Sequence, residues 1–245
     1  MTAHAKLDPD KILQTSERLE ARICERFPES GLARVCERLV QLADHARETS
    51  EQIRRPQIPI RVASVLIIGL MLAAIVAAAW AALTQSTGGR LSWSDLVQVA
   101  EAAVNDLVLV GVAIYFLASF ERRIKRARVV RALHDLRRMA HLIDVHQLTK
   151  TPYRAEDLRP ESEAEAVQTS SSPKRHLSRF QMGRYLDYCS EMLSLTGKIS
   201  ALYGDGFGDA VALEAVNGVE ALTIGLQRKI WQKMMLLSSG SAGGK

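Results

Sequence analysis

The side chains with the clearest chemical potential are Glu101, Asn105 and Asp106, which lie in a stretch otherwise rich in apolar residues. On a helix, Glu101 and Asn105 share a face, whereas Asp106 lies about 100° round from Asn105. Ionisable groups at membrane depth cost about 2.5 to 3.5 kcal/mol each, so they usually face protein or water. Two interpretations follow. In the one we prefer, Glu101 lies at the membrane interface and Asn105 and Asp106 form hydrogen bonds to neighbouring helices; in the other, acids from several copies line a cation path or a proton site.

The element that would place these residues in a membrane is a pair of apolar segments. The stretch from Val62 to Leu83 holds twenty-two residues without one charge. As a helix it would reach about 33 Å, against roughly 30 Å of bilayer hydrocarbon. Because a buried core helix is rarely so apolar on every face, the pattern predicts a first membrane span over about residues 60–83.

A second apolar run ends at Phe120, and its uninterrupted part, from Leu107, is only fourteen residues long. That is too short to cross a bilayer, so a span of normal length must begin near residues 96–101. The predicted second span, about residues 97–120, therefore carries Glu101 into or near the hydrocarbon. Counting back from Phe120 places Asp106 about 21 Å along the helix.

Small residues recur every four positions along the first span: Gly69, Ala73, Ala77 and Ala81. Such a ladder lets another helix approach closely, as helix association in lipid requires. Alanine-rich composition alone is the other interpretation. We expect packing between spans and a homo-oligomer.

Basic residues flank the two predicted spans. Arg54, Arg55 and Arg61 precede the pair, and eight basic residues against two acids occupy residues 121–138, whereas the predicted periplasmic loop 84–95 holds only Arg90. The positive-inside rule then predicts both termini in the cytoplasm of a multi-pass bacterial inner (plasma) membrane protein. A basic run beside a span favours lipid over nucleic acid as its partner. The expected head-group contacts are Arg122, Arg123, Lys125 and Arg126.

Outside the spans the chain predicts helices only. Aromatic residues make up 5% of the chain, and β-branched residues do not alternate in runs, so no sheet is expected. Residues 1–56 predict an N-terminal cytoplasmic helical hairpin that begins with Asp8 as N-cap and Pro9 in the first turn. Residues 57–120 form the two-span hairpin, and residues 121–150 extend its second helix into the cytoplasm.

The C-terminal part predicts a second cytoplasmic helical hairpin. Residues 151–173 contain prolines, serines and acids and predict a flexible linker. Residues 174–237 carry two apolar stripes joined by a glycine-rich turn at 204–209, and residues 238–245 read as a flexible tail. Because both hairpins have incomplete apolar faces, we expect them to pack together into one helical bundle.

Catalytic and metal-binding motifs are missing from the sequence. It contains no G-x-S-x-G, no H-E-x-x-H and no metal-type cysteine spacing. His141, Asp144 and His146 cannot converge on a regular helix, since His146 lies about 140° from His141. We expect no catalytic residue, no metal and no cofactor. The three cysteines, Cys24, Cys36 and Cys189, are expected to be small buried residues.

The sequence therefore predicts an all-α integral membrane protein without enzymatic activity. Its expected function is that of an inner-membrane scaffold or sensor, which oligomerises through its spans and presents a cytoplasmic helical bundle. The expected partners are the lipid bilayer, further copies of the chain and a cytoplasmic protein. The alternative is a small oligomeric ion channel or membrane-permeabilising effector with pore-facing Glu101 and Asp106.

Overall fold

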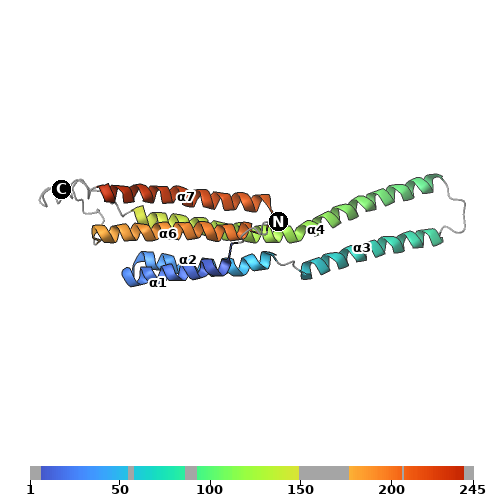
Figure 1. Ribbon diagram of the computed structural model, residues 1–245. Coiled ribbons are helices and arrows are strands. Elements are labelled where there is room, and N and C mark those ends of the chain that lie inside the picture. The colour runs from blue at the N-terminus through green and yellow to red at the C-terminus, as the bar shows by residue number, and fades with distance from the viewer. Residues whose placement is uncertain (1–6, 55–57, 86–92, 149–176, 206, 240–245) are drawn as a thin grey trace, which may run out of the picture. The chain divides into compact units, whose positions relative to one another are not determined.

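The computed structural model describes residues 7–54, 58–85, 93–148, 177–205 and 207–239, apart from some side chains in the apolar helices. These residues form six α-helices, and no strand occurs among them. The helices are α1 (Pro9–Arg26), α2 (Gly31–Arg54), α3 (Ile58–Gln85), α4 (Trp93–Leu148), α6 (Arg179–Gly204) and α7 (Ala210–Ser239) (Figure 1). The all-α prediction is confirmed.

The chain divides into two compact units. The first comprises Met1–Arg54 and Arg128–Lys245, and its described part contains α1, α2, the end of α4, α6 and α7. The second comprises Arg55–Ala127 and contains α3 and the beginning of α4. The bundle and the apolar helices predicted from the sequence thus fall into different units.

The α1–α2 hairpin begins and turns by local chemistry. The Asp8 side chain accepts hydrogen bonds from the backbone of Asp10 and Lys11 and so caps α1, with Pro9 as its first residue. In the turn, Glu29 adopts a positive φ of 56°. The Ser30 hydroxyl then accepts from the backbone N–H of Ala33 at the start of α2. The predicted N-cap is confirmed.

One apolar core joins the helices of the first unit. α1 contributes Leu19 and Ile23, and α2 contributes Leu32 and Leu39, all fully buried. Further buried core positions come from the end of α4, from α6 and from α7, among them Leu133, Leu136, Ile143, Leu186, Leu193, Ile199 and Ile230. The N- and C-terminal hairpins therefore pack into one bundle, as the sequence predicts, and the last five turns or so of α4 lie inside it.

Two features of its sequence fix where α6 begins and how closely it packs against α7. Ser178 and Gln181 form a capping box that starts α6. A Cβ at Gly197 would lie 3.1 Å from the Thr223 hydroxyl of α7, so glycine permits the close α6–α7 approach. The two helices of the hairpin predicted for the C-terminal part therefore pack closely against each other at this point.

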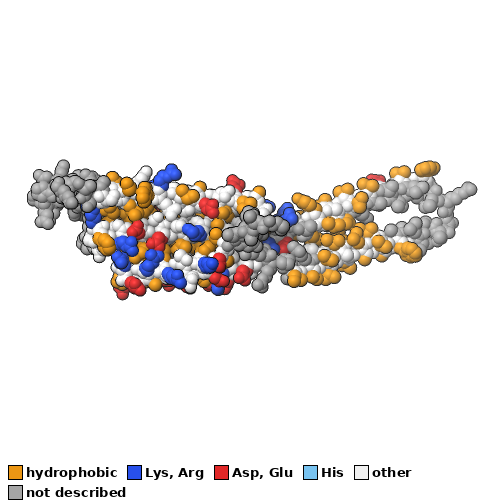
Figure 2. Space-filling model, in the orientation of Figure 1, with side chains coloured by type: hydrophobic (Ala, Val, Ile, Leu, Met, Phe, Trp, Pro, Cys, Tyr) orange, Lys and Arg blue, Asp and Glu red, His pale blue; other side chains and the backbone are white. Residues whose placement is uncertain are grey.

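Large apolar side chains are mostly exposed in the second unit, whereas the first unit buries many of its own in the core. Along α3, Val65, Leu66 and Leu70 are each about two-thirds exposed or more. Figure 2 shows hydrophobic side chains predominating over the described parts of this unit, whereas charged and hydrophobic side chains mix over the bundle. Within the described part of the chain, no helix combines the length and the apolar character needed to cross a membrane. The two predicted spans are not supported by that finding and remain a prediction.

Several predicted segments fall outside the described residues. The predicted linker at 151–173 lies entirely outside them, as do residues 240–245 of the predicted tail. The predicted loop at 84–95 overlaps two helices, because α3 continues to Gln85 and α4 already begins at Trp93. The predicted tail likewise begins inside α7, which ends at Ser239.

Candidate functional site

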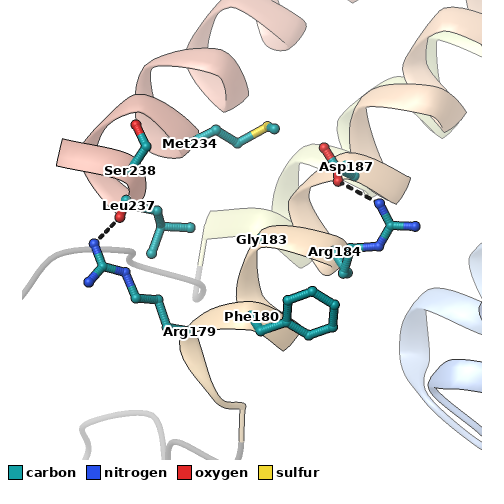
Figure 3. A pocket seen from close by; sticks show the side chains of 8 residues that line it. All are labelled: Arg179, Phe180, Gly183, Arg184, Asp187, Met234, Leu237 and Ser238. Carbon is teal, nitrogen blue, oxygen red and sulfur yellow. Dashed lines mark hydrogen bonds and ion pairs between the residues drawn. The ribbon is translucent and has the colours of Figure 1, made fainter. Parts of the chain in front are cut away.

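A groove lies between the start of α6 and the end of α7 in the bundle. It has a volume of about 520 Å³. Gly183 lies at its centre, with Phe180 and Arg184 on α6 and Met234 and Leu237 on α7 around it (Figure 3). A Cβ built on Gly183 would meet nothing within 4 Å, so this glycine keeps the groove open.

The apolar floor of the groove is bordered by guanidinium groups. Arg179 donates a hydrogen bond to the backbone carbonyl of Leu237 and so satisfies one of the free carbonyls at the end of α7 (Figure 3). Arg184 pairs with Asp187 at 3.2 Å. Phe180 is 69% exposed, and the Arg26 guanidinium of α1 lies 5.9 Å from its ring centroid. A large apolar side chain is thus left open to solvent among three positive charges.

A second hollow continues along the same helix pair. It has a volume of about 540 Å³ and adjoins the first hollow, with which it shares the lining residues Asp187 and Met234. Trp231, which is 61% exposed, lines this part together with Glu191. We call the two hollows together the α6–α7 groove. Its lining residues on α6 run from position 179 to 194, about 22 Å of helix.

Aromatic rings join α6 to the end of α1. Phe27, the residue that follows α1, packs edge-on against Tyr185 and Tyr188, with ring centroids 5.7 Å and 6.2 Å apart. Glu191 forms an ion pair with Arg22 of α1, whose guanidinium also lies 5.8 Å from the Tyr188 ring centroid. Burial raises the pKa of Tyr185, so its hydroxyl keeps its proton to more alkaline pH than that of an exposed tyrosine. These ring and ion-pair contacts fix α6, which carries one side of the groove, against α1.

A polar network closes the end of α4 inside the bundle. Lys233 of α7 donates to the Gln147 side-chain oxygen at 2.6 Å and to the Gln147 backbone carbonyl at 2.9 Å. Gln147, only 1% exposed, donates in turn to Asp144 at 2.5 Å. Burial lowers the pKa of Lys233, and the Asp144 carboxylate partly opposes that shift. The positive charge at the helix C-terminus also favours this arrangement.

The structure describes the side chains of only some of the residues predicted to lie in the membrane. Glu101 and Asn105 are both exposed on α4, and the side chain of Asp106 lies outside the described residues. On α3, Gly69, Ala73 and Ala77 are exposed, and a Cβ at Gly69 would meet nothing within 4 Å. The side chain of Ala81 is not among those described. The small-residue ladder is open at Gly69, and its role in packing stays a prediction.

The basic candidates at the end of the second unit differ from one another. Arg122 and Arg126 are exposed, and Arg123 lies 5.0 Å from the Phe116 ring centroid. Lys125 is instead buried and forms an ion pair with Glu121 at 2.9 Å. Three of the four predicted head-group residues therefore present their charge to solvent, and Lys125 is the exception.

The described residues offer one exposed thiol and no cluster of metal-ligating side chains. Cys36 and Cys189 are buried as expected, but Cys24 is exposed, because the buried stripe of α1 runs through Leu19 and Ile23 instead. Burial raises the pKa of the Cys36 thiol to about 12, which makes it a poor nucleophile. No group of three metal-ligating side chains converges anywhere in the described part of the chain.

Sequence reasoning did not find the α6–α7 groove. An unexplained glycine inside an apolar helical pattern, Gly183, was the available signal, together with Phe180 outside the buried stripe. Periodicity assigns such residues to a solvated face, and only the packing of α7 against α6 turns that face into a groove. Comparison of the chain with family models, curated proteins and solved structures finds no match.

Proposed function

We propose that this chain is a non-enzymatic scaffold or sensor of the bacterial inner membrane, anchored through its second unit and offering the helical bundle to partners. The observation that carries the proposal is the exposed apolar surface of α3 and early α4, where side chains such as Leu70, Leu107 and Tyr115 are more than 70% exposed. Apolar surface of that extent marks an interaction with lipid or protein. The uncharged stretch 62–83 matches the thickness of a bilayer.

The distribution of charge supports the same proposal. Arg122 and Arg123 are exposed directly after the apolar part of α4, where they would meet anionic head groups. Their position and that of Arg54, Arg55 and Arg61 favour an arrangement with both termini in the cytoplasm. A separately packed bundle with an apolar groove suits a binding module, and the missing catalytic motifs speak against an enzyme.

The native thiols allow a direct test of topology. Cys24 is exposed on the bundle, whereas Cys36 and Cys189 are buried, so a Ser86→Cys variant adds one thiol in the predicted periplasmic loop. A membrane-impermeant maleimide should label Ser86→Cys on intact spheroplasts and Cys24 only after lysis. Extraction of the chain by alkaline carbonate, or labelling of Cys24 on intact spheroplasts, would contradict the proposal.

A flux measurement separates the scaffold from the channel alternative. The purified chain in liposomes is compared with a double variant, Glu101→Gln/Asp106→Asn, for cation flux and for oligomer size. A scaffold conducts no ions, and polar contacts between spans predict a weaker oligomer in the variant. Flux that falls in the variant while the oligomer persists would replace this proposal with a channel.

A further inference from the structure

We propose that the α6–α7 groove binds an acidic amphipathic helix of a partner protein, with apolar side chains seated over Gly183 and carboxylates against Arg179 and Arg184. The inference rests on the proposed scaffold function and names the chemistry of the partner. Its starting point is the shape of the groove, which follows two antiparallel helices for about 22 Å. A helix of about four turns has that length and presents apolar residues at spacings of three and four.

The floor of the groove requires an apolar face on its occupant. Met234 and Leu237 line one side, and Phe180 and Trp231 are exposed along the groove without a covering element among the described residues. Aromatic anchors of this kind concentrate the binding energy of interfaces. Because Gly183 leaves open space at the centre, a Leu or Phe side chain of the occupant can enter there.

Charge at the rim selects an acidic occupant. Arg26, Arg179 and Arg184 surround the exposed Phe180, and Asp187 is the carboxylate that lines this end of the groove. Asp187 pairs with Arg184, and Glu191 further along the groove pairs with Arg22, so Arg26 and Arg179 leave positive charge in excess at the Phe180 end of the groove. Guanidinium groups bind carboxylates in planar, two-point geometry, so Glu or Asp residues beside the apolar stripe of the occupant would complement them.

The experiment uses the full chain embedded in nanodiscs as the target for a displayed library of helical peptides about sixteen residues long. Peptides selected on the wild-type chain are then measured against Gly183→Trp, which fills the groove. Gly225→Trp is the matched control, since Gly225 lies on α7, is exposed, and also has nothing within 4 Å of a built Cβ. Both variants replace a helical glycine where space is free, so both should fold.

The expected result is a set of peptides with an apolar stripe and flanking acids. They should bind Gly183→Trp at least about tenfold more weakly than wild type, and Gly225→Trp about as well as wild type. Affinity should fall with added salt and fall again in an Arg179→Gln/Arg184→Gln variant, because rim ion pairs are screened.

Other outcomes overturn the inference. Peptides that bind Gly183→Trp as tightly as wild type would place binding elsewhere, and peptides without acids or salt dependence would show that the charge argument is wrong. Failure to enrich any peptide, while a control target yields binders, would also contradict it. Incorporation of the chain into nanodiscs is measured first: a chain that stays out contradicts the proposed function, whereas an embedded chain without groove ligands contradicts this inference alone.

Discussion

Leucines in the two units have opposite environments. Leu193 of α6 is fully buried in the bundle, whereas Leu70 of α3 is 73% exposed. The bundle helices each have a stripe of apolar residues with polar residues opposite, and five such stripes can close around one core. α3 has apolar residues on all faces from Val62 to Leu83 and so has no face suited to water. Apolar residues stabilise a fold only where their arrangement lets other residues cover them.

The sharpest test of this difference is a pair of matched truncations. Leu193→Ala should destabilise the bundle by about 2–5 kcal/mol, because it removes buried methyl groups and leaves a cavity. Leu70→Ala should change the free energy of bundle unfolding by less than about 0.5 kcal/mol. Chemical denaturation of each variant in the same detergent measures both. Equal losses in the two variants would show that the units do not unfold separately.

The stability of the bundle should likewise depend on buried polar groups of the first unit and not on exposed polar groups of the second. Lys233→Met removes the donor of both hydrogen bonds to Gln147 and leaves two acceptor atoms of a buried residue without that donor, so we expect a loss of about 1–3 kcal/mol. Lys229→Met, one turn earlier and exposed, should stay within about 0.5 kcal/mol of wild type. Glu101→Gln, exposed in the second unit, should leave the bundle midpoint where it is. An unchanged midpoint for Lys233→Met would remove the polar network from the account of bundle stability.

Alkaline pH should weaken the bundle through its buried acids. Burial raises the pKa of Cys36 from 9.0 to about 12, so between these values the folded chain keeps a proton that the unfolded chain has lost. Stability therefore falls as pH rises through this window, by at most about 1.4 kcal/mol per pH unit for this thiol. The raised pKa values of Tyr185 and Tyr203 act in the same direction.

Urea unfolding at several pH values, with Cys36→Ala as the control, measures this slope. The control should show a shallower decline above about pH 9, whatever its stability at neutral pH. Identical slopes in the two proteins would mean that the Cys36 thiol is not shielded. Maleimide labelling of the folded chain near neutral pH should modify Cys24 first, since Cys36 and Cys189 are buried.

The smallest effect is expected at the α1–α2 turn. Glu29 has a φ of 56°, which glycine adopts without strain, so Glu29→Gly should stabilise the bundle by about 1 kcal/mol or less. The same change at Glu25, inside α1, should destabilise by about 0.5–1 kcal/mol because glycine is a poor helix former. Thermal unfolding compares the two variants. Destabilisation by Glu29→Gly would show that the Glu29 side chain stabilises the folded state by more than its positive φ destabilises it.

Most of the fold could be predicted because the helices carry local signals. Asp8 and Pro9 mark the start of α1, and the stripe of Tyr188, Met192 and Ile199 marks the buried face of α6. The exposed Cys24 and the buried Lys125 were not predicted. Whether such a residue is exposed or buried depends on which side chains pack around it. The spacing of residues within a single helix does not predict that packing.

The candidate site could not be predicted for the same reason. The α6–α7 groove exists because Gly183 of one helix lies beside Met234 and Leu237 of another, a juxtaposition of residues about fifty positions apart in the chain. Sequence patterns instead drew attention to Glu101, Asn105 and Asp106, whose unusual chemistry is visible without any neighbour.

The sequence by itself determined the helical class, the cap of α1, and the contrast between striped helices and a helix apolar on every face, because these depend on interactions within a few turns. Tertiary structure decided that the end of α4 joins the N- and C-terminal hairpins, that Lys233 closes its terminus, and that a groove stays open between α6 and α7. These features arise where side chains from different helices meet, and the free energy of such contacts depends on packing geometry rather than on residue order.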